Sequence, residues 1–326
     1  MPYSAQIMRR ARLRLESQKA DKESVYQHNL QEAYEKVPQL REIDIQLRKS
    51  MAVAAQTAFT KGVDVVQAMN EVKAANLALQ QQRKALIDAN FAPGFLDDSP
   101  VCSHCGGVGY IGSTMCRCLA ELCRQEQLVE IAQLTNGTEQ FPAFRLDYYP
   151  DRVDSRYGAS PRAIMERNLK QAKKYAAEFT GEENLLLVGG TGLGKTFLSA
   201  CIANSVAEKG FSVAYESAPA LFSKLEKNRF DPDDESRLAC AQLLQSDLLI
   251  IDDLGTEMPG QFVTSALYNL VNDRLLSGKA MIISTNLNSD DLPKRYSAQI
   301  ASRLRGGFMR VAFVGEDIRI KKNRGM

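Results

Sequence analysis

The chain has 326 residues, of which 44% are hydrophobic and 25% charged, and its formal net charge is +2. This length is typical of two or three domains with substantial cores, and the composition excludes a chain that is disordered throughout. A charge so close to balance gives no support for a general nucleic-acid or membrane binder, so any basic binding surface must be local.

Hydropathy and cysteine usage indicate the compartment. No apolar run approaches the ~20 residues that a membrane span needs, and the basic start of the chain lacks the apolar core of a secretory signal. We therefore expect a cytoplasmic protein with no membrane partner. Four of the seven cysteines gather between positions 102 and 118. In a reducing compartment such clustering indicates metal binding rather than disulfides.

The N-terminal part, residues 1–98, is predicted to be helical. It is rich in Ala, Gln, Lys, Glu and Leu, with apolar positions at helical spacing. Between about Ser4 and Ala89 there is one proline, Pro38, and one glycine, Gly62, so we expect three helices with breaks near these two residues. A stretch rich in Pro, Gly and Asp at 91–99 then reads as a linker.

A cysteine module is expected at residues 99–120. Its pattern is C-x2-C-x10-C-x-C, with glycines in between that suit tight turns, and four thiolates are enough for tetrahedral structural zinc. The short second spacing leaves His104 or Cys123 open as a replacement for one ligand, and free buried thiols are the competing interpretation. A closed site of this kind folds a small module or recognition surface rather than catalysing a reaction. The four expected ligands are Cys102, Cys105, Cys116 and Cys118.

Residues 121–159 are expected to form a helix to about 134 and then an extended connector at 141–150. From residue 160 to the end, apolar strands alternate with helices, which predicts an α/β domain with a parallel sheet flanked by helices. The expected helices are 161–179 and 195–209, and the expected strands are 185–188, 212–215, 248–251 and 280–284.

The glycine loop after strand 185–188 has the pattern G-x4-G-K-T of a phosphate loop, and it lies between a strand and a helix as such a loop requires. Backbone amides and the helix N-terminus would face the phosphates of ATP. Lys195 would reach the β- and γ-phosphates, and the Thr196 hydroxyl would reach Mg²⁺. The expected nucleotide-binding residues are Gly189, Gly190, Thr191, Gly192, Leu193, Gly194, Lys195 and Thr196.

Polar side chains follow the next strands, at the end of a parallel sheet where ligands bind. Asp252 is expected to hold Mg²⁺ through water, and Asp253 to polarise the attacking water, a task commonly given to glutamate. Glu257 is a possible assistant. Asn286 would lie beside the γ-phosphate, although a turn or helix cap explains it equally well.

Together with Ile-Ala-Ser-Arg-Leu at 300–304 and Gly-Glu-Asp-Ile-Arg at 315–319, these motifs resemble AAA+ ATPases of the bacterial replicative-helicase loader (DnaC/DnaI) family, related to IstB-type proteins. The resemblance covers about residues 141–319 and implies that residues 160–326 form an AAA+ P-loop ATPase domain. It implies that Asn286 is a γ-phosphate sensor and that Arg319 contacts the nucleotide of its own subunit. It also implies that Arg303 is an arginine finger for a neighbouring subunit's ATP, so that the chain self-associates through the ATP site.

The resemblance further implies two partners, a replicative DNA helicase and single-stranded DNA, with the protein loading the ring helicase onto the strand. Metal-binding N-terminal regions engage the helicase in similar DnaI-type proteins, but the long helical region here leaves open which part meets the partner. The alternatives are a transposition helper or a nucleotide-gated adaptor with little turnover. Weak candidates for DNA contacts are Lys294, Arg295 and Arg305, with Tyr296 and Phe308 serving either stacking or the core.

Overall fold

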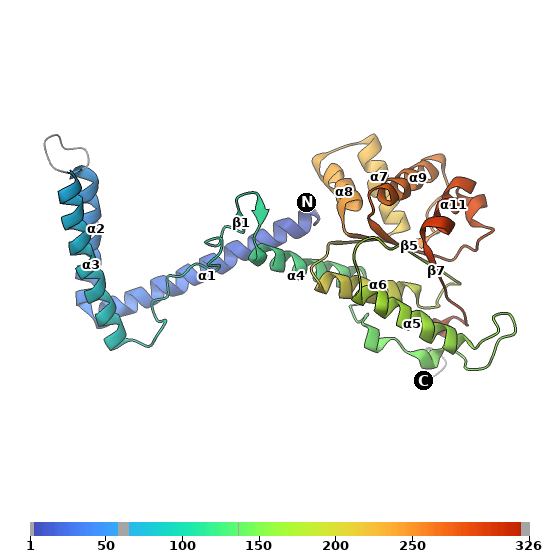
Figure 1. Ribbon diagram of the computed structural model, residues 1–326, viewed down its shortest axis with the longest axis horizontal. Coiled ribbons are helices and arrows are strands. Elements are labelled where there is room, and N and C mark those ends of the chain that lie inside the picture. The colour runs from blue at the N-terminus through green and yellow to red at the C-terminus, as the bar shows by residue number, and fades with distance from the viewer. Residues whose placement is uncertain (1–2, 58–64, 136, 321–326) are drawn as a thin grey trace. The chain divides into compact units, whose positions relative to one another are not determined.

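The computed structural model describes residues 3–57, 65–135 and 137–320 (Figure 1). It divides the chain into two units, Arg14–Cys116 and a larger one made of Met1–Leu13 with Arg117–Met326. Within the described ranges, no helix is long and apolar enough to cross a membrane. The domain boundaries expected from the sequence, which give segments 1–98, 99–120, 121–159 and 160–326, stay predictions.

Three helices occupy the N-terminal part: α1 (Ala5–Lys36), α2 (Pro38–Thr57) and α3 (Val65–Asn90). The break at Pro38 is confirmed, because proline lacks the N–H that an uninterrupted helix needs and is suited to a first turn. The expected break at Gly62 lies outside the described residues. Asp44 of α2 accepts hydrogen bonds from Arg83 Nε of α3 at 2.7 Å and from the Tyr34 hydroxyl of α1 at 2.8 Å, which joins the three helices.

The larger unit contains a five-stranded parallel sheet with strand order β4-β5-β6-β3-β7. The predicted α/β class is therefore confirmed. Expected strands match four of these, but strand β7 was not predicted, and the connector expected to be extended instead contains two short 3-10 turns, Phe141–Ala143 and Leu146–Tyr148. The strands are β3 (Leu185–Val188), β4 (Val213–Ser217), β5 (Leu248–Leu254), β6 (Ala280–Thr285) and β7 (Met309–Ala312).

Helices cover both faces of the sheet, and strand residues alternate between two buried apolar clusters. Figure 1 shows α5 and α6 together on one side, and α7, α9 and α11 on the other. Tyr296 and Phe308 belong to the second cluster, so they serve the core. The helices are α4 (Arg117–Leu134), α5 (Pro161–Ala177), α6 (Lys195–Glu208), α7 (Ala218–Phe230), α8 (Asp234–Gln245), α9 (Gln261–Leu276), α10 (Leu292–Arg295) and α11 (Ala298–Gly307).

Helix α4 is fastened to the edge of the sheet by one side chain. Gln127 is 1% exposed, and its Nε2 donates to Phe211 O at 2.9 Å. Its Oε1 accepts from Val213 N of the edge strand β4 at 2.9 Å. The glutamine thus satisfies buried backbone groups that no further strand pairs with.

A buried arginine ties α9 to two other segments. Arg274 has no exposed surface, and the four protons on its two terminal nitrogens are shared among five oxygen atoms within hydrogen-bonding distance. The acceptors are Leu243 O and Leu244 O, both oxygens of Ser246 that face it, and Ala280 O, at 2.7 to 3.2 Å. Burial lowers the pKa of Arg274 to about 10, so the guanidinium stays charged at neutral pH.

Candidate functional site

The glycine loop joins β3 to α6, as its motif requires. Gly192 and Gly194 have φ angles of +70° and +86°, which a residue with a side chain rarely adopts. Gly189 has a different constraint, because an added Cβ would lie 2.5 Å from Phe313 O. Glycine is therefore needed at these positions for the loop to turn and to pack against the chain after β7.

Lys195 lies inside the loop. It is 4% exposed, and its Nζ donates to Gly189 O at 2.9 Å and Gly190 O at 2.8 Å. Burial lowers the pKa of its ammonium, while the charges of Asp253 and Asp252 act in the opposite direction. The lysine is thus already held among the backbone groups expected to surround a phosphate.

Two segments distant in sequence support the loop from outside. The Tyr149 hydroxyl, buried in the connector, donates to Leu193 O at 2.9 Å. Ile318 N donates to Gly192 O at 2.9 Å. Tyr149 was not among the residues singled out in the sequence, since nothing in its local pattern indicates a contact with a loop more than forty residues away.

The paired aspartates lie near the end of β5 and face this loop. Asp252 is 6% exposed, and its carboxylate accepts from the Ser284 hydroxyl at 2.5 Å and the Tyr215 hydroxyl at 3.2 Å. Asp253 lies beyond it with a φ of +54°, and its N–H donates to Ser284 Oγ at 2.8 Å. Neither of these contacts with Asp252 was predicted.

The charges around Asp253 show which groups share the site. Burial raises the pKa of its carboxyl, the neighbouring Asp252 raises it further, and Lys195 and Arg319 lower it. Lys195 and Asp253 are thus each close enough to the other three charged groups, Asp252 and the exposed Arg319 among them, for their charges to interact.

An Asp253→Asn variant should unfold at higher denaturant concentration than the parent at neutral pH. A raised carboxyl pKa means that the fold disfavours the ionised form, so removing the charge relieves burial and repulsion by Asp252. Asparagine also tolerates the left-handed backbone. ATP hydrolysis should fall at the same time. An unchanged or lower unfolding midpoint would show that the charge of Asp253 does not strain the fold.

The oxygen donors fit Mg²⁺. Thr196 and Asp252 offer a hydroxyl and a carboxylate, the hard oxygen ligands that Mg²⁺ prefers. Two hydroxyls lie between them: the Tyr215 hydroxyl donates to Asp252 at 3.2 Å, and Ser199 Oγ lies 3.1 Å from that hydroxyl and 3.0 Å from the backbone oxygen of Thr196. A metal ion bound here would neutralise phosphate charge.

Asn286 and Arg303, expected to act as phosphate sensor and arginine finger, occupy different places. Asn286 is exposed just after β6. Its Oδ1 lies close to Gly255, where an added Cβ would be 3.4 Å away from it. Arg303 of α11 is half-buried and bonded to α9, with its Nη2 2.7 Å from the Tyr268 hydroxyl and 2.9 Å from Asn272 Oδ1. The guanidinium also lies over the Tyr268 ring. Asn286 is therefore next to the loop that follows β5, whereas Arg303 is hydrogen-bonded to residues of α9.

Glu257 and Arg295 hold that loop in place. Glu257 is 5% exposed, and its carboxylate accepts from Gly255 N at 2.9 Å and from the Tyr296 hydroxyl at 2.6 Å. Arg295 bonds to Gly255 O, to Glu257 O and to the Glu257 carboxylate. These bonds favour a structural role for Glu257 over activation of water. They likewise favour a structural role for Arg295 over contact with DNA. Lys294 and Arg305 are exposed.

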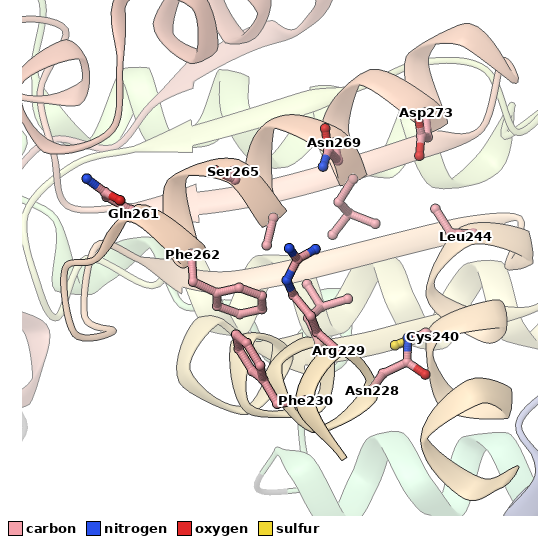
Figure 2. Close-up of a pocket in the computed structure, with 13 residues that line it drawn as sticks. Asn228, Arg229, Phe230, Cys240, Leu244, Gln261, Phe262, Ser265, Asn269 and Asp273 are labelled. Carbon is pink, nitrogen blue, oxygen red and sulfur yellow. The ribbon is translucent and has the colours of Figure 1, made fainter. Parts of the chain in front are cut away.

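The larger unit also contains a pocket away from the glycine loop. A pocket of about 530 Å³ opens between α7, α8 and α9, where the rings of Phe230 and Phe262 are 5.7 Å apart (Figure 2). Arg229 lines it from α7. No residue of the predicted nucleotide site lines this pocket, so it does not compete with the loop as the ATP site.

The four cysteines expected to bind metal come together. Their sulfur atoms all lie within 4.8 Å of one another, and Cys102 Sγ is 3.8 Å from Cys116 Sγ. Tetrahedral zinc with bonds of about 2.3 Å requires sulfur separations of about 3.8 Å. Cys105 Sγ accepts from Gly109 N at 3.2 Å, and a short hairpin of β1 (Tyr110–Ile111) and β2 (Thr114–Met115) carries the chain back to Cys116. The geometry of this cluster fits zinc.

Neither alternative ligand belongs to this cluster of described residues. Cys123 is fully buried on α4, its Sγ lies 3.5 Å from Met8 Sδ, and burial raises its pKa to about 11. Its thiolate is therefore disfavoured. His104 Nδ1 lies 3.3 Å from Ser103 Oγ.

Substitution of Cys102 by serine should lower the zinc content of the purified protein, because a hydroxyl is a poor replacement for a thiolate ligand. We expect metal analysis by mass spectrometry to give well under one zinc per chain, with nucleotide affinity unchanged. Cys201→Ser is the matched control, since Cys201 is buried in α6 outside the cluster. Equal zinc content in both variants would remove Cys102 from the ligand set.

Comparison with known proteins identifies the nucleotide-binding domain. Residues 162–299 match the family described as IstB-like ATP binding protein. The replicative helicase loader DnaC of Escherichia coli K12 is 25% identical over 140 residues, which are 43% of this chain and 57% of DnaC. An insertion-sequence ATP-binding protein of Sinorhizobium fredii is 37% identical over 99 residues, 30% of this chain and 33% of that protein.

Solved structures include a crystal structure of the DnaC helicase loader, with a TM-score of 0.45 and 22% identity over 53% of this chain and 98% of that one. In the sequence comparison, the chain spans 57% of the length of the DnaC proteins that it matches. Residues 162–299 of this chain thus match the IstB-like ATP binding family, and the chain is similar in part to the DnaC helicase loader and to an insertion-sequence ATP-binding protein.

Proposed function

We propose that this protein is a Mg²⁺-dependent ATPase that acts in DNA replication by placing a ring helicase on single-stranded DNA. The observation that carries the ATPase proposal is the gathering of Lys195, Asp252 and Asp253 at one edge of a parallel sheet. The similarity to DnaC, a replicative helicase loader by name, supports the helicase as partner. The cytoplasm is the compartment that this role requires.

Each residue of the site has a defined task in this proposal. The loop amides and Lys195 bind the phosphates and orient the terminal one. Asp252 and Thr196 hold Mg²⁺, which supplies charge neutralisation when bound. Asp253 orients the attacking water, Asn286 contacts the terminal phosphate, and Arg319 contacts the nucleotide from the same subunit. The glycine loop of one chain and Arg303 of a neighbouring chain would complete the site only upon assembly.

Arg303→Ala should keep ATP affinity within about twofold and lose about 10³-fold of the hydrolysis that depends on assembly. Its bonds to Tyr268 and Asn272 fix the direction of the guanidinium before a neighbour arrives, so little ordering is needed at the interface. Steady-state hydrolysis across a range of protein concentrations measures the effect. Arg305→Ala, a variant of an exposed arginine on the same helix, is the control. Full turnover in Arg303→Ala would disprove the finger assignment.

The cysteine cluster and the helices before it are the proposed helicase-binding part. Structural metal sites of this type build a folded surface without an open coordination position. Similarity to the AAA+ domain is confined to 162–299 in the family match, so residues before it are free to specify the partner.

Helicase loading is tested with the full chain, the replicative helicase of the same host, and single-stranded DNA covered by its binding protein. The proposal expects ATP-dependent transfer of the helicase to DNA and subsequent unwinding of a forked duplex. Lys195→Ala serves as the inactive control. Hydrolysis without any helicase complex or loading would leave an ATPase with a different client.

An ATP-dependent transposition helper is the second candidate. The insertion-sequence ATP-binding protein has a higher identity, 37%, although over a shorter stretch than DnaC. The same preparation should then stimulate DNA joining by a transposase and not unwinding by a helicase. A nucleotide-gated adaptor is the third candidate, and it would bind ATP with negligible turnover because Asp253 replaces the usual glutamate.

A further inference from the structure

The carboxylate of Asp252 is held by buried hydroxyl groups from the strands on either side. Ser284 of β6 donates to Oδ1 at 2.5 Å, and Tyr215 of β4 donates to Oδ2 at 3.2 Å. Ser284 has no exposed surface and Tyr215 is 6% exposed. Each carboxylate oxygen therefore has its own donor, and the group cannot rotate without breaking a buried bond.

Ser284 also holds the next residue. Its hydroxyl oxygen accepts from Asp253 N at 2.8 Å, at the residue whose φ of +54° departs from strand geometry. A single side chain thus fixes the orientation of one aspartate and the backbone of the other. Such a left-handed residue persists only where its surroundings favour it.

Tyr215 connects the same carboxylate to the helix that follows the glycine loop. Its hydroxyl lies 3.1 Å from Ser199 Oγ, and Ser199 Oγ in turn lies 3.0 Å from Thr196 O. Since the Tyr215 proton goes to Asp252, the one proton of Ser199 serves either the Tyr215 oxygen or Thr196 O. Strand β4 thus supplies a hydroxyl to the aspartate expected to hold Mg²⁺, although it carries no recognised nucleotide-binding motif.

We propose that Tyr215 and Ser284 are positioning residues that orient Asp252 towards the divalent metal of the nucleotide complex. This inference rests on the proposed function, because it concerns the metal that ATP brings to the site. Hydrogen bonds from outer groups fix the direction of a metal-binding carboxylate and leave its other lone pairs for the metal or its water ligands. Loss of such a partner typically costs about 10- to 100-fold in metal affinity.

The test is Mn²⁺ binding to the full chain carrying a non-hydrolysable ATP analogue, followed by the electron paramagnetic resonance signal of free Mn²⁺. Tyr215→Phe and Ser284→Ala each remove one hydroxyl. Both variants should bind Mn²⁺ about 10-fold or more weakly, while their affinity for the analogue in EDTA stays within about twofold of the parent. Hydrolysis should need correspondingly more Mg²⁺ for half-maximal rate.

Two controls match the substitutions outside the site. Tyr175→Phe removes a hydroxyl from a buried tyrosine of the same apolar cluster, whose partner is Glu183 O at 2.8 Å. Ser212→Ala removes a buried serine that donates to the Asp247 carboxylate at 2.7 Å and accepts from Asp247 N at 3.0 Å, the same pair of bonds that Ser284 makes. Neither control should change Mn²⁺ affinity.

Unchanged Mn²⁺ affinity in Tyr215→Phe and Ser284→Ala, an equal loss in the controls, or no Mn²⁺ binding by the parent complex would each overturn the proposal. Weakened Mn²⁺ binding confined to the two site variants would support it, even if the parent hydrolyses no ATP. That last result would refute the proposed turnover alone.

Discussion

Lys195→Ala should lower the affinity for Mg²⁺-ATP by about 100-fold or more and abolish hydrolysis. The ammonium is buried in the loop and held by Gly189 O and Gly190 O, so it points to the place where phosphate oxygens are expected. A hydrogen bond to a charged group contributes about 1.5–3 kcal/mol, and each 1.4 kcal/mol is about tenfold in affinity. Calorimetric titration with and without Mg²⁺ measures the loss.

Lys209→Ala is the control for this prediction. Its ammonium also donates to two backbone carbonyls, Ala176 O and Ala177 O, but beyond the other end of α6. It should bind ATP like the parent. If Lys195→Ala binds ATP within threefold of the parent while remaining folded, the phosphates are not read by this lysine.

Arg274→Met should lower the free energy of unfolding by about 3–5 kcal/mol. Methionine fills similar space but donates no hydrogen bond, so the buried carbonyls of Leu243, Ser246 and Ala280 lose their donor. Each unsatisfied buried group costs about 1–3 kcal/mol. Equilibrium unfolding in urea, read from both fluorescence and circular dichroism, measures the change.

Arg237→Met is the comparison variant, because Arg237 is an exposed arginine that pairs with Asp234 on α8. A surface pair of this kind contributes at most about 1 kcal/mol. Arg274→Lys should fall between the two, since an ammonium reaches fewer of the acceptors. A loss in Arg274→Met no greater than that in Arg237→Met would show that the buried bonds do not stabilise the fold.

The sequence predicts the central strands and the glycine loop because their signals are local. Strands β3, β5 and β6 are nearly continuous apolar runs, as expected for strands buried on both faces. Strand β7 was not predicted because it lacks such a local signal. Of its residues Met309–Ala312, only Val311 is buried, so an edge strand with a solvated surface lacks the apolar run.

The charged members of the candidate site could be predicted, but their supports could not. Asp252 and Asp253 follow a buried strand, which indicates a ligand-binding edge from the sequence alone. Their contact with Ser284 and Tyr215 depends on the register of three strands that are distant in sequence, such as the pairing of Ser217 with Asp252. No local pattern fixes such a register. Nothing in the sequence around Ser284 or Tyr215 distinguishes these side chains from ordinary residues of the core.

The clamp made by Gln127 sets a limit on how the protein can be divided. A fragment that begins at residue 160, the boundary that the sequence favours, would lack α4 and leave Phe211 O and Val213 N at the edge of β4 without partners. It would also uncover apolar residues that pack on Ile131, Phe144 and Tyr149. An open strand edge beside an apolar surface is a template for pairing with other chains, so such a fragment is prone to aggregate. Helix α4 therefore covers the open edge of the parallel sheet and keeps it from pairing with other chains.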